Sequence, residues 1–242
     1  MSNKIIHAIS GPRNISTALM YSFSQRENCA VFDEPFYGKY LFDNPRLGHP
    51  GLEETLERWP TSAGAILARI ETLASVSSEV YLKNMAHHMV NEDWKWAANA
   101  VHVFWIRHPR KVIASFSKVI PDLKATDIGL TQELEQWSIV QQFNGPSIIV
   151  DTDEMLKNPK RTMPLICSAL GISWQECMLQ WPSGEKEYDG PWWPHWYNNA
   201  HKSTGFGPPK DMPASLDLKY EKIVEECLPA YRSLFKNRLK LE

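Results

Sequence analysis

The chain has 242 residues, a formal net charge of -2 and 43% hydrophobic residues, enough to fill the core of one α/β domain over residues 1–242. This charge excludes the strongly basic surface of a nucleic-acid-binding protein, and four cysteines without CxxC or Cys/His spacing exclude a disulfide scaffold. No apolar run approaches the roughly 20 residues that span a bilayer. We therefore expect a cytoplasmic protein without a membrane span or a nucleic-acid partner.

The first 23 residues contain a strand, a tight turn and the start of a helix. Residues 4–10 are mostly β-branched or small apolar residues, which predicts a buried strand. From Ser16 onward apolar residues recur at helical spacing, and Ser16 and Thr17 stand where unpaired N–H groups need oxygen partners. A strand that turns tightly into a helix points several N–H groups at one place, beside the positive end of the helix dipole. The sequence therefore predicts an anion site, most often for phosphate.

The next segment predicts a second strand and an excursion on the surface. Residues 29–33 form an apolar run that ends at Asp33 and Glu34, before a proline that stops regular structure. These carboxylates are either reactive groups beside the anion site or caps of the following helix. Residues 43–62, rich in proline and glycine, predict an irregular excursion with a short helix, and residues 63–77 predict a helix that faces the core.

Polar residues also follow the third and fourth predicted strands. Residues 80–85 predict a strand that is followed at once by His87 and His88. Residues 101–106 are the most continuous apolar run, which predicts a central strand, and Arg107 follows it. Open parallel sheets bind ligands at the carboxyl ends of their strands. The histidines are therefore candidates for a site, with hydrogen-bonded structural histidines as the alternative.

The second half of the chain continues the alternation of strands and helices. Residues 131–143 predict a helix with Leu134, Trp137 and Gln141 on one side. Residues 181–213 hold six prolines and four tryptophans, which predicts a long ordered loop whose rings either wall a pocket or fill space over the sheet. The remaining elements are a strand at 147–150 and helices at 163–170 and 216–237. This alternation predicts a mostly parallel sheet covered by helices on both faces.

The loop SGPRNIST resembles the phosphosulfate loop of the sulfotransferase family, whose members use 3′-phosphoadenylyl sulfate. Arg13 matches the basic residue of that loop, and Ser16 and Thr17 match its hydroxyl pair. Asn14 and Ile15 stand where the family usually has Ser and Gly, which predicts a tighter or distorted cradle. The resemblance implies a three-layer α/β/α fold of the P-loop nucleotide-binding type.

Further resemblances extend over roughly residues 4 to 172. Arg107 and Ser115, in IRHPRKVIASFSK, are similar to the Arg and Ser that hold the 3′-phosphate of the nucleotide in this family. The segment DTDEMLKNPKRTMPLICSALGI is similar to its strand-turn-helix motif, but Thr152 stands where the family has Tyr. Lys202 and Ser203, in KSTGF, match a possible nucleotide loop. The resemblance implies a sulfuryl donor, 3′-phosphoadenylyl sulfate, and no metal.

The resemblance also implies which groups carry the chemistry. Arg13 would meet the phosphosulfate together with the N–H groups of residues 14–17. The hydroxyl or amine of a small-molecule acceptor has to lose a proton, so a base is needed within hydrogen-bond reach. Our first candidate is His87, because an unperturbed imidazole titrates near neutral pH, followed by Glu34 and then His88.

Two other classes of protein remain as alternatives. A P-loop kinase or NTPase would carry GxxxxGK[ST], whereas Ile15 here precedes Ser16 and the loop lacks the second glycine. A catalytically inactive nucleotide-binding scaffold would explain the altered loop at Asn14 and Ile15. The retained arginines and the serine of the second motif favour an active sulfotransferase over both.

Overall fold

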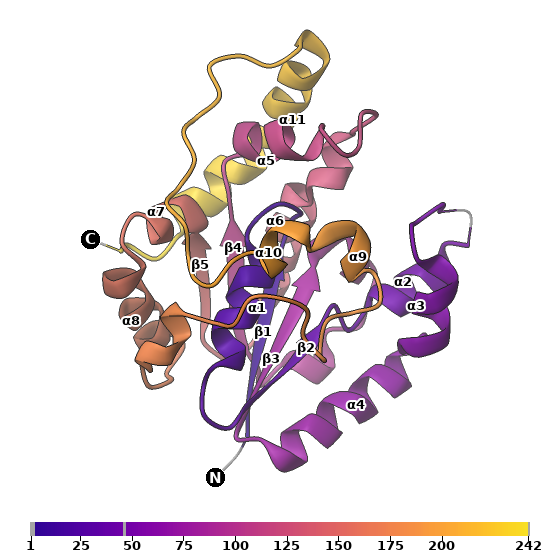
Figure 1. Ribbon diagram of the computed structural model, residues 1–242, viewed down its shortest axis with the longest axis vertical. Coiled ribbons are helices and arrows are strands. Elements are labelled where there is room, and N and C mark those ends of the chain that lie inside the picture. The colour runs from indigo at the N-terminus through magenta and orange to yellow at the C-terminus, as the bar shows by residue number, and fades with distance from the viewer. Residues whose placement is uncertain (1–2, 46, 242) are drawn as a thin grey trace.

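A computed structural model describes residues 3–45 and 47–241 and contains a five-stranded sheet at its centre (Figure 1). All the pairings are parallel, in the order β2-β3-β1-β4-β5. The strands are β1 (Lys4–Ser10), β2 (Cys29–Asp33), β3 (Glu79–Met85), β4 (Val101–Ile106) and β5 (Ser147–Asp151). Each lies within one residue of its predicted bounds, and the predicted mostly parallel sheet is confirmed.

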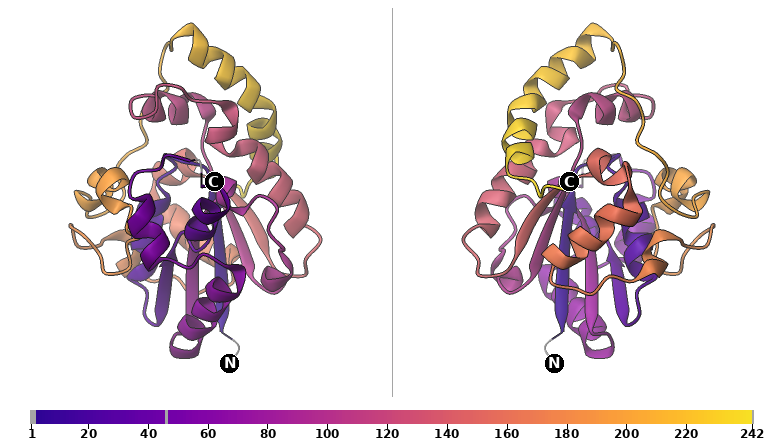
Figure 2. Two further views of the ribbon diagram at one scale, coloured as in Figure 1. Left: turned by 90° about the vertical axis from the view of Figure 1, so that its right-hand side faces the viewer. Right: turned by 90° about the vertical axis from the view of Figure 1, so that its left-hand side faces the viewer.

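Helices cover both faces of this sheet, which gives three layers (Figure 2). One face packs against α1 and α8, and the other packs against α4, α5, α6 and α11. The helices are α1 (Ser16–Ser24), α2 (Tyr37–Asp43), α3 (Leu52–Arg58), α4 (Ala63–Val76), α5 (Pro109–Phe116), α6 (Leu130–Val140), α7 (Thr152–Leu156), α8 (Pro159–Ala169), α9 (Trp193–Trp196), α10 (Asn198–His201) and α11 (Leu218–Lys236). Short 3-10 helices are η1 (Ala86–Met89), η2 (Lys95–Ala97), η3 (Ala125–Ile128) and η4 (Glu176–Leu179). Within the described residues, no helix is long and apolar enough to cross a membrane.

The strands are apolar on both faces because both faces are covered. Ile9 and Phe104 point into the core under α6 and α11, whereas Ala8 and Val103 point into the core under α1 and α8. All four are at most 1% exposed. Burial on two sides therefore explains why these strands appear in the sequence as continuous apolar runs.

Helices α2 and α6 show details that the sequence did not predict. Helix α2 begins at Tyr37, shortly after β2, but its N-cap is Phe36, so neither Asp33 nor Glu34 caps it as the alternative for these carboxylates predicted. Helix α6 buries Glu133 and Gln136 in full, whereas Leu134 and Trp137 are only half-buried. The Gln136 side chain donates to the main-chain oxygen of Ala86 (2.7 Å), which replaces a hydrogen bond to water. Leu134 and Trp137 are partly buried against the same core, and the most buried face of the helix also takes in the polar side chains of Glu133 and Gln136.

Residues 181–213 cross over the carboxyl ends of the strands in Figure 1. They form two single helical turns, α9 and α10, and otherwise run as an ordered loop, as the proline and tryptophan content predicts. Trp192 is 1% exposed, and its ring packs edge-on against Tyr37 and Trp59. The segment is therefore fixed over the sheet by its aromatic side chains.

Candidate functional site

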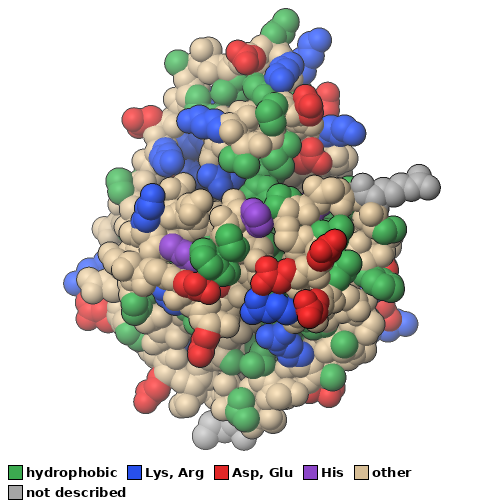
Figure 3. Space-filling view, turned by 45° about the vertical axis from the view of Figure 1, so that its right-hand side comes forward, with side chains coloured by type: hydrophobic (Ala, Val, Ile, Leu, Met, Phe, Trp, Pro, Cys, Tyr) green, Lys and Arg blue, Asp and Glu red, His purple; other side chains and the backbone are tan. Residues whose placement is uncertain are grey.

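A cleft of about 400 Å³ opens at the carboxyl edge of the sheet. Its lining comes from the turn after β1, the ends of β2, β3 and β4, helix α5 and the segment 192–210. On the face drawn in Figure 3, Lys and Arg side chains gather in a hollow beside hydrophobic side chains, with histidine close by. The sheet edge predicted to bind a ligand is thus hollowed, and most candidate residues line it.

The turn after β1 has the geometry of an anion cradle. A Cβ at Gly11 would lie 2.2 Å from the main-chain oxygen of Ile128, so only glycine fits there. Arg13 (φ 57°) and Ile15 (φ 51°) both adopt the left-handed conformation. Two such residues within three positions turn successive N–H groups toward one side, an arrangement that binds anions. Ile15 therefore takes the conformation expected of a glycine, at a strain of about 1–3 kcal/mol for a β-branched residue.

The side chain of Asn14 holds this turn to the sheet. Asn14 is 2% exposed, and its amide donates to the main-chain oxygen of Trp105 at the end of β4. Its Oδ1 accepts from the hydroxyl of Thr152 (2.7 Å), the first residue of α7. Two of the three departures from the family pattern, Asn14 and Thr152, are therefore bonded to each other. The side chain of Asn14 thus ties the turn to the end of β4 and to α7.

Positive charge gathers on the β4 side of the cradle. The Nε of Arg13 donates to Oγ of Ser115 (3.0 Å), which joins the cradle to helix α5. Arg107 donates to the main-chain oxygen of Arg13 (3.2 Å) and to Asp153 (3.1 Å), which also pairs with Lys111. Burial and the charge of Arg107 lower the pKa of Arg13. The two anion sites predicted separately are thus neighbours in one positively charged region.

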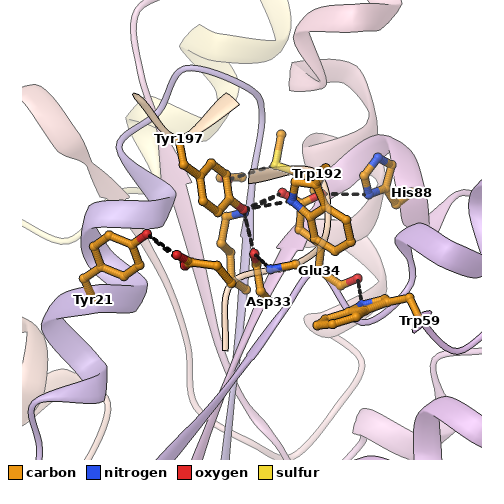
Figure 4. A network of polar contacts seen from close by, with 12 residues as sticks. Tyr21, Asp33, Glu34, Trp59, His88, Trp192 and Tyr197 are labelled. Carbon is orange, nitrogen blue, oxygen red and sulfur yellow. Dashed lines mark hydrogen bonds and ion pairs between the residues drawn. The ribbon is translucent and has the colours of Figure 1, made fainter. Parts of the chain in front are cut away.

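The β2 and β3 side of the same cleft carries proton-accepting groups. Glu34, His87 and His88 all line it, and the strand order places them across β1 from Arg107. Glu34 has φ 40°, and its main-chain oxygen accepts from Nε1 of Trp59 (3.2 Å), as Figure 4 shows. Sparsely populated backbone conformations of this kind cluster at functional sites.

Burial separates the proton affinities of these groups. It lowers the pKa of His87 to about 4, with a smaller contribution from His49. The pKa of His88 also lies well below 6.5, because of burial and the neighbouring His87. Burial raises the pKa of Glu34, Lys83 opposes the rise, and the charge of Asp33 adds to it. The reason for preferring His87, an unperturbed pKa near neutrality, does not hold in the folded chain.

Lys83 is a site residue that the sequence reasoning missed. It lines the cleft, is 2% exposed and pairs with Asp33 (2.9 Å) and Glu34. Burial lowers the pKa of Lys83, but these two carboxylates raise it above its usual value. The available signal was a lysine inside a strand predicted to be buried, which requires a partner of opposite charge.

The remaining candidates are placed as follows. Ser203 lines the cleft, but its hydroxyl accepts from Trp181 (3.1 Å) and donates to the oxygen of Ala200 (2.6 Å). Lys202 is exposed and lies outside the lining. Trp192 and Trp196 from the aromatic segment belong to the lining. Within residues 3–45 and 47–241, no three His, Cys, Asp or Glu side chains gather as a metal site would require.

Comparison with known proteins adds a family and a fold. The model of a sulfotransferase domain family matches residues 3–238. The chain is 32% identical over 232 residues to branched-chain-amino-acid aminotransferase-like protein 2 of Arabidopsis thaliana, covering 96% of this chain and 41% of that protein. It is 31% identical to protein 1 of the same name and plant, again over 41% of its length. The chain thus spans about two fifths of the length of these curated relatives.

Solved structures show a similar fold at low sequence identity. The sulfotransferase domain of the olefin synthase from Synechococcus PCC 7002 has a TM-score of 0.59 at 18% identity, over 93% of this chain and 95% of that one. A sulfotransferase from Alicyclobacillus acidocaldarius has a TM-score of 0.58 at 11% identity, over 99% and 98% of the two chains. These likenesses bear on the fold alone and agree with the α/β architecture.

Proposed function

The chain belongs to the sulfotransferase domain family, and we propose that it moves a sulfuryl group from 3′-phosphoadenylyl sulfate to a hydroxyl or amine of a small-molecule acceptor. The observation that carries this proposal is the division of one cleft into two halves. The arginines lie on the β4 side of the anion cradle, and the proton-accepting groups lie on the β3 side. A transfer between a polyanionic donor and a neutral nucleophile needs both halves next to each other.

The residues around the cradle fit a donor with two anionic ends. The N–H groups of residues 14–17 and the guanidinium of Arg13 would hold the phosphosulfate end. Arg107 and Ser115 would hold the 3′-phosphate, as the family resemblance implies. Arginine suits both positions because its planar fork binds phosphate and sulfate oxygens in pairs and stays charged. Arg107 would then share its hydrogens between Asp153 and the nucleotide.

The protein's part in the transfer is to position the acceptor and remove its proton. The acceptor oxygen or nitrogen forms a bond to sulfur as the bond from sulfur to the bridging oxygen breaks, and 3′,5′-bisphosphoadenosine leaves with that electron pair. Arg13 would stabilise the charge that develops on the leaving oxygen. A base in the β2 and β3 half takes the acceptor's proton. In-line attack requires that base to lie opposite the arginines, as Glu34 and His87 do.

We propose Glu34 as this base and His87 as a group that orients the acceptor. A general base works best when its pKa is close to the operating pH. Burial raises the pKa of Glu34 toward neutrality, whereas it lowers that of His87 to about 4. Glu34→Gln should lower the transfer rate by ~100 to 10,000-fold. His87→Asn should have a smaller effect on the rate, and the reverse ranking would return the role to His87.

Ligand binding tests the donor without knowledge of the acceptor. A ligand that binds only the folded protein raises its melting temperature, so we expect 3′,5′-bisphosphoadenosine to stabilise the chain. ATP with Mg²⁺ should give a smaller shift, because it lacks the 3′-phosphate and the loop lacks the lysine of an ATPase. Stabilisation by ATP and Mg²⁺ but not by the bisphosphate would contradict the proposal and favour a phosphotransferase.

A further inference from the structure

A buried network of polar side chains joins the ends of β2 and β3 to the segment 181–213 (Figure 4). It consists of Asp33 and Glu34 from the end of β2, Lys83 from β3, and Tyr197 from the segment. Asp33, Lys83 and Tyr197 are 0%, 2% and 4% exposed. Because water does not reach these three side chains, each hydrogen bond has to be supplied by the protein itself.

Lys83 uses all of its hydrogens within the network. An ammonium group has three N–H donors and no acceptor. Those of Lys83 are directed to Asp33 (2.9 Å), to Oε1 of Glu34 and to the hydroxyl of Tyr197 (2.7 Å). No donor remains for a ligand, so Lys83 holds a carboxylate in place rather than binding substrate.

The hydroxyl of Tyr197 has only one orientation that satisfies its neighbours. Lys83 and Nε1 of Trp192 (3.0 Å) both donate to its oxygen, which occupies both lone pairs. Its single hydrogen therefore goes to Asp33, whose Oδ2 lies 2.7 Å away. Asp33 Oδ2 also accepts from the main-chain N–H of Gly190 (2.9 Å). Tyr197 and Asp33 thus fix the ammonium group of Lys83, and the Tyr197 oxygen also lies 3.4 Å from Oε1 of Glu34.

One carboxylate oxygen of the network stays free. Oε1 of Glu34 accepts from Lys83, whereas Oε2 forms no hydrogen bond with the described residues and lies 3.5 Å from Nδ1 of His88. Burial leaves His88 neutral at pH 7, since its pKa is well below 6.5. Glu34 belongs to the lining of the cleft. Its free oxygen is the position at which a proton from the acceptor can be received.

From this arrangement we infer that Tyr197 and Asp33 are positioning residues, which hold Lys83 on one oxygen of Glu34 and leave the other oxygen free to accept the proton of the acceptor. The inference rests on the proposed function for its chemistry, since it gives Glu34 the role of base. Both residues contact Lys83, and the Tyr197 hydroxyl also lies 3.4 Å from Oε1 of Glu34, so the segment 181–213 becomes a part of the catalytic site.

The ionisable groups around Glu34 come from several elements. They are Asp33 on β2, Lys83 on β3, Tyr37 on α2, His88 on η1 and Tyr197 on the segment 181–213. Lys83 and Tyr197 stabilise the ionised form of Glu34, and Asp33 destabilises it. Removal of the Tyr197 hydroxyl and removal of the Asp33 charge should therefore move the titration of Glu34 in opposite directions.

The experiment follows the ¹³C signal of the Glu34 carboxyl as a function of pH in the full chain, with Glu34→Gln to assign it. In Tyr197→Phe the midpoint should rise by about one pH unit, because Lys83 loses an acceptor that orients it. In Asp33→Asn it should fall by a similar amount. Tyr188→Phe is the matched control, since that hydroxyl lies on the same segment but bonds to Ser24.

An unchanged midpoint in Tyr197→Phe, or an equal shift in Tyr188→Phe, would overturn the inference. Should Tyr197→Phe be too unstable in buffer, the titrations of this variant and of the unaltered chain are repeated in sucrose, which stabilises folded proteins, and the same outcomes decide. The fall in Asp33→Asn reports the loss of a like charge beside Glu34 and identifies the titrating carboxyl; a rise or no change there would contradict that identification. Calorimetry with 3′,5′-bisphosphoadenosine distinguishes a failure of this inference from a failure of the proposed function. Absence of binding to the unaltered chain would refute the donor but not the network, whose titration is measured without nucleotide.

Discussion

The bond between Asn14 and Thr152 makes a specific prediction about the anion cradle. Thr152→Val keeps the shape of the side chain but replaces the hydroxyl with a methyl group. The Oδ1 of Asn14, which accepts from that hydroxyl at 2.7 Å, is then left without a donor. Asn14 is 2% exposed, so water cannot replace the lost hydrogen bond. The cradle should become both less stable and less well ordered.

The magnitude follows from the burial of the orphaned oxygen. A buried acceptor left without a partner costs ~1–3 kcal/mol. For a chain of this size, 1 kcal/mol corresponds to ~2–4 °C in melting temperature, so a loss near the middle of that range lowers it by ~4–8 °C. Affinity for 3′,5′-bisphosphoadenosine should fall as well, because Asn14 would no longer hold the turn to α7.

The assay is thermal unfolding with and without the bisphosphate. Thr72→Val is the control: Thr72 lies on the exposed side of α4, and its hydroxyl bonds only within the helix, to the oxygen of Ala68. A surface change of this kind should stay within ~0.5 kcal/mol. If Thr152→Val melts at the same temperature as Thr72→Val, the bond does not hold the cradle and the reasoning is refuted.

Three further predictions address the anion site and the core. Arg107→Ala should weaken binding of 3′,5′-bisphosphoadenosine by ~1.5–3 kcal/mol, measured by calorimetry, and unchanged affinity would remove Arg107 from the site. Gly11→Ala should destabilise the chain by ~1–3 kcal/mol in urea, because its Cβ would lie 2.2 Å from the oxygen of Ile128, whereas Gly64→Ala meets nothing within 4 Å and should not destabilise. Burial lowers the pKa of His102 to about 4, below the value near 6.5 of the unfolded chain, so its folded form binds fewer protons and its contribution to stability is lost as pH falls from 6.5 toward 4. The difference in free energy of unfolding between the unaltered chain and His102→Gln should therefore shrink by ~3 kcal/mol between pH 7 and pH 4. A difference that does not change with pH would count against a neutral buried His102.

The sequence determined the strands and the anion cradle because their signals are local. Residues 4–10, 29–33 and 101–106 are strands with the predicted bounds. Their apolar residues are continuous because helices cover both faces of the sheet, so the sequence of each strand carries this signal by itself. The turn after β1 could be identified for the same reason, since glycine, arginine and two hydroxyl residues stand together.

The partners of the polar side chains were decided only by the tertiary structure. Thr152 is 138 residues from Asn14, and Tyr197 is 114 residues from Lys83, so no local pattern relates the members of either pair. A lysine inside a strand or a glutamine on a helix looks the same in sequence whether or not a buried partner is present. The strand order β2-β3-β1-β4-β5 brings Glu34 and Arg107 to opposite sides of one cradle. Chain order alone cannot specify that arrangement, because it follows from how all five strands pack together.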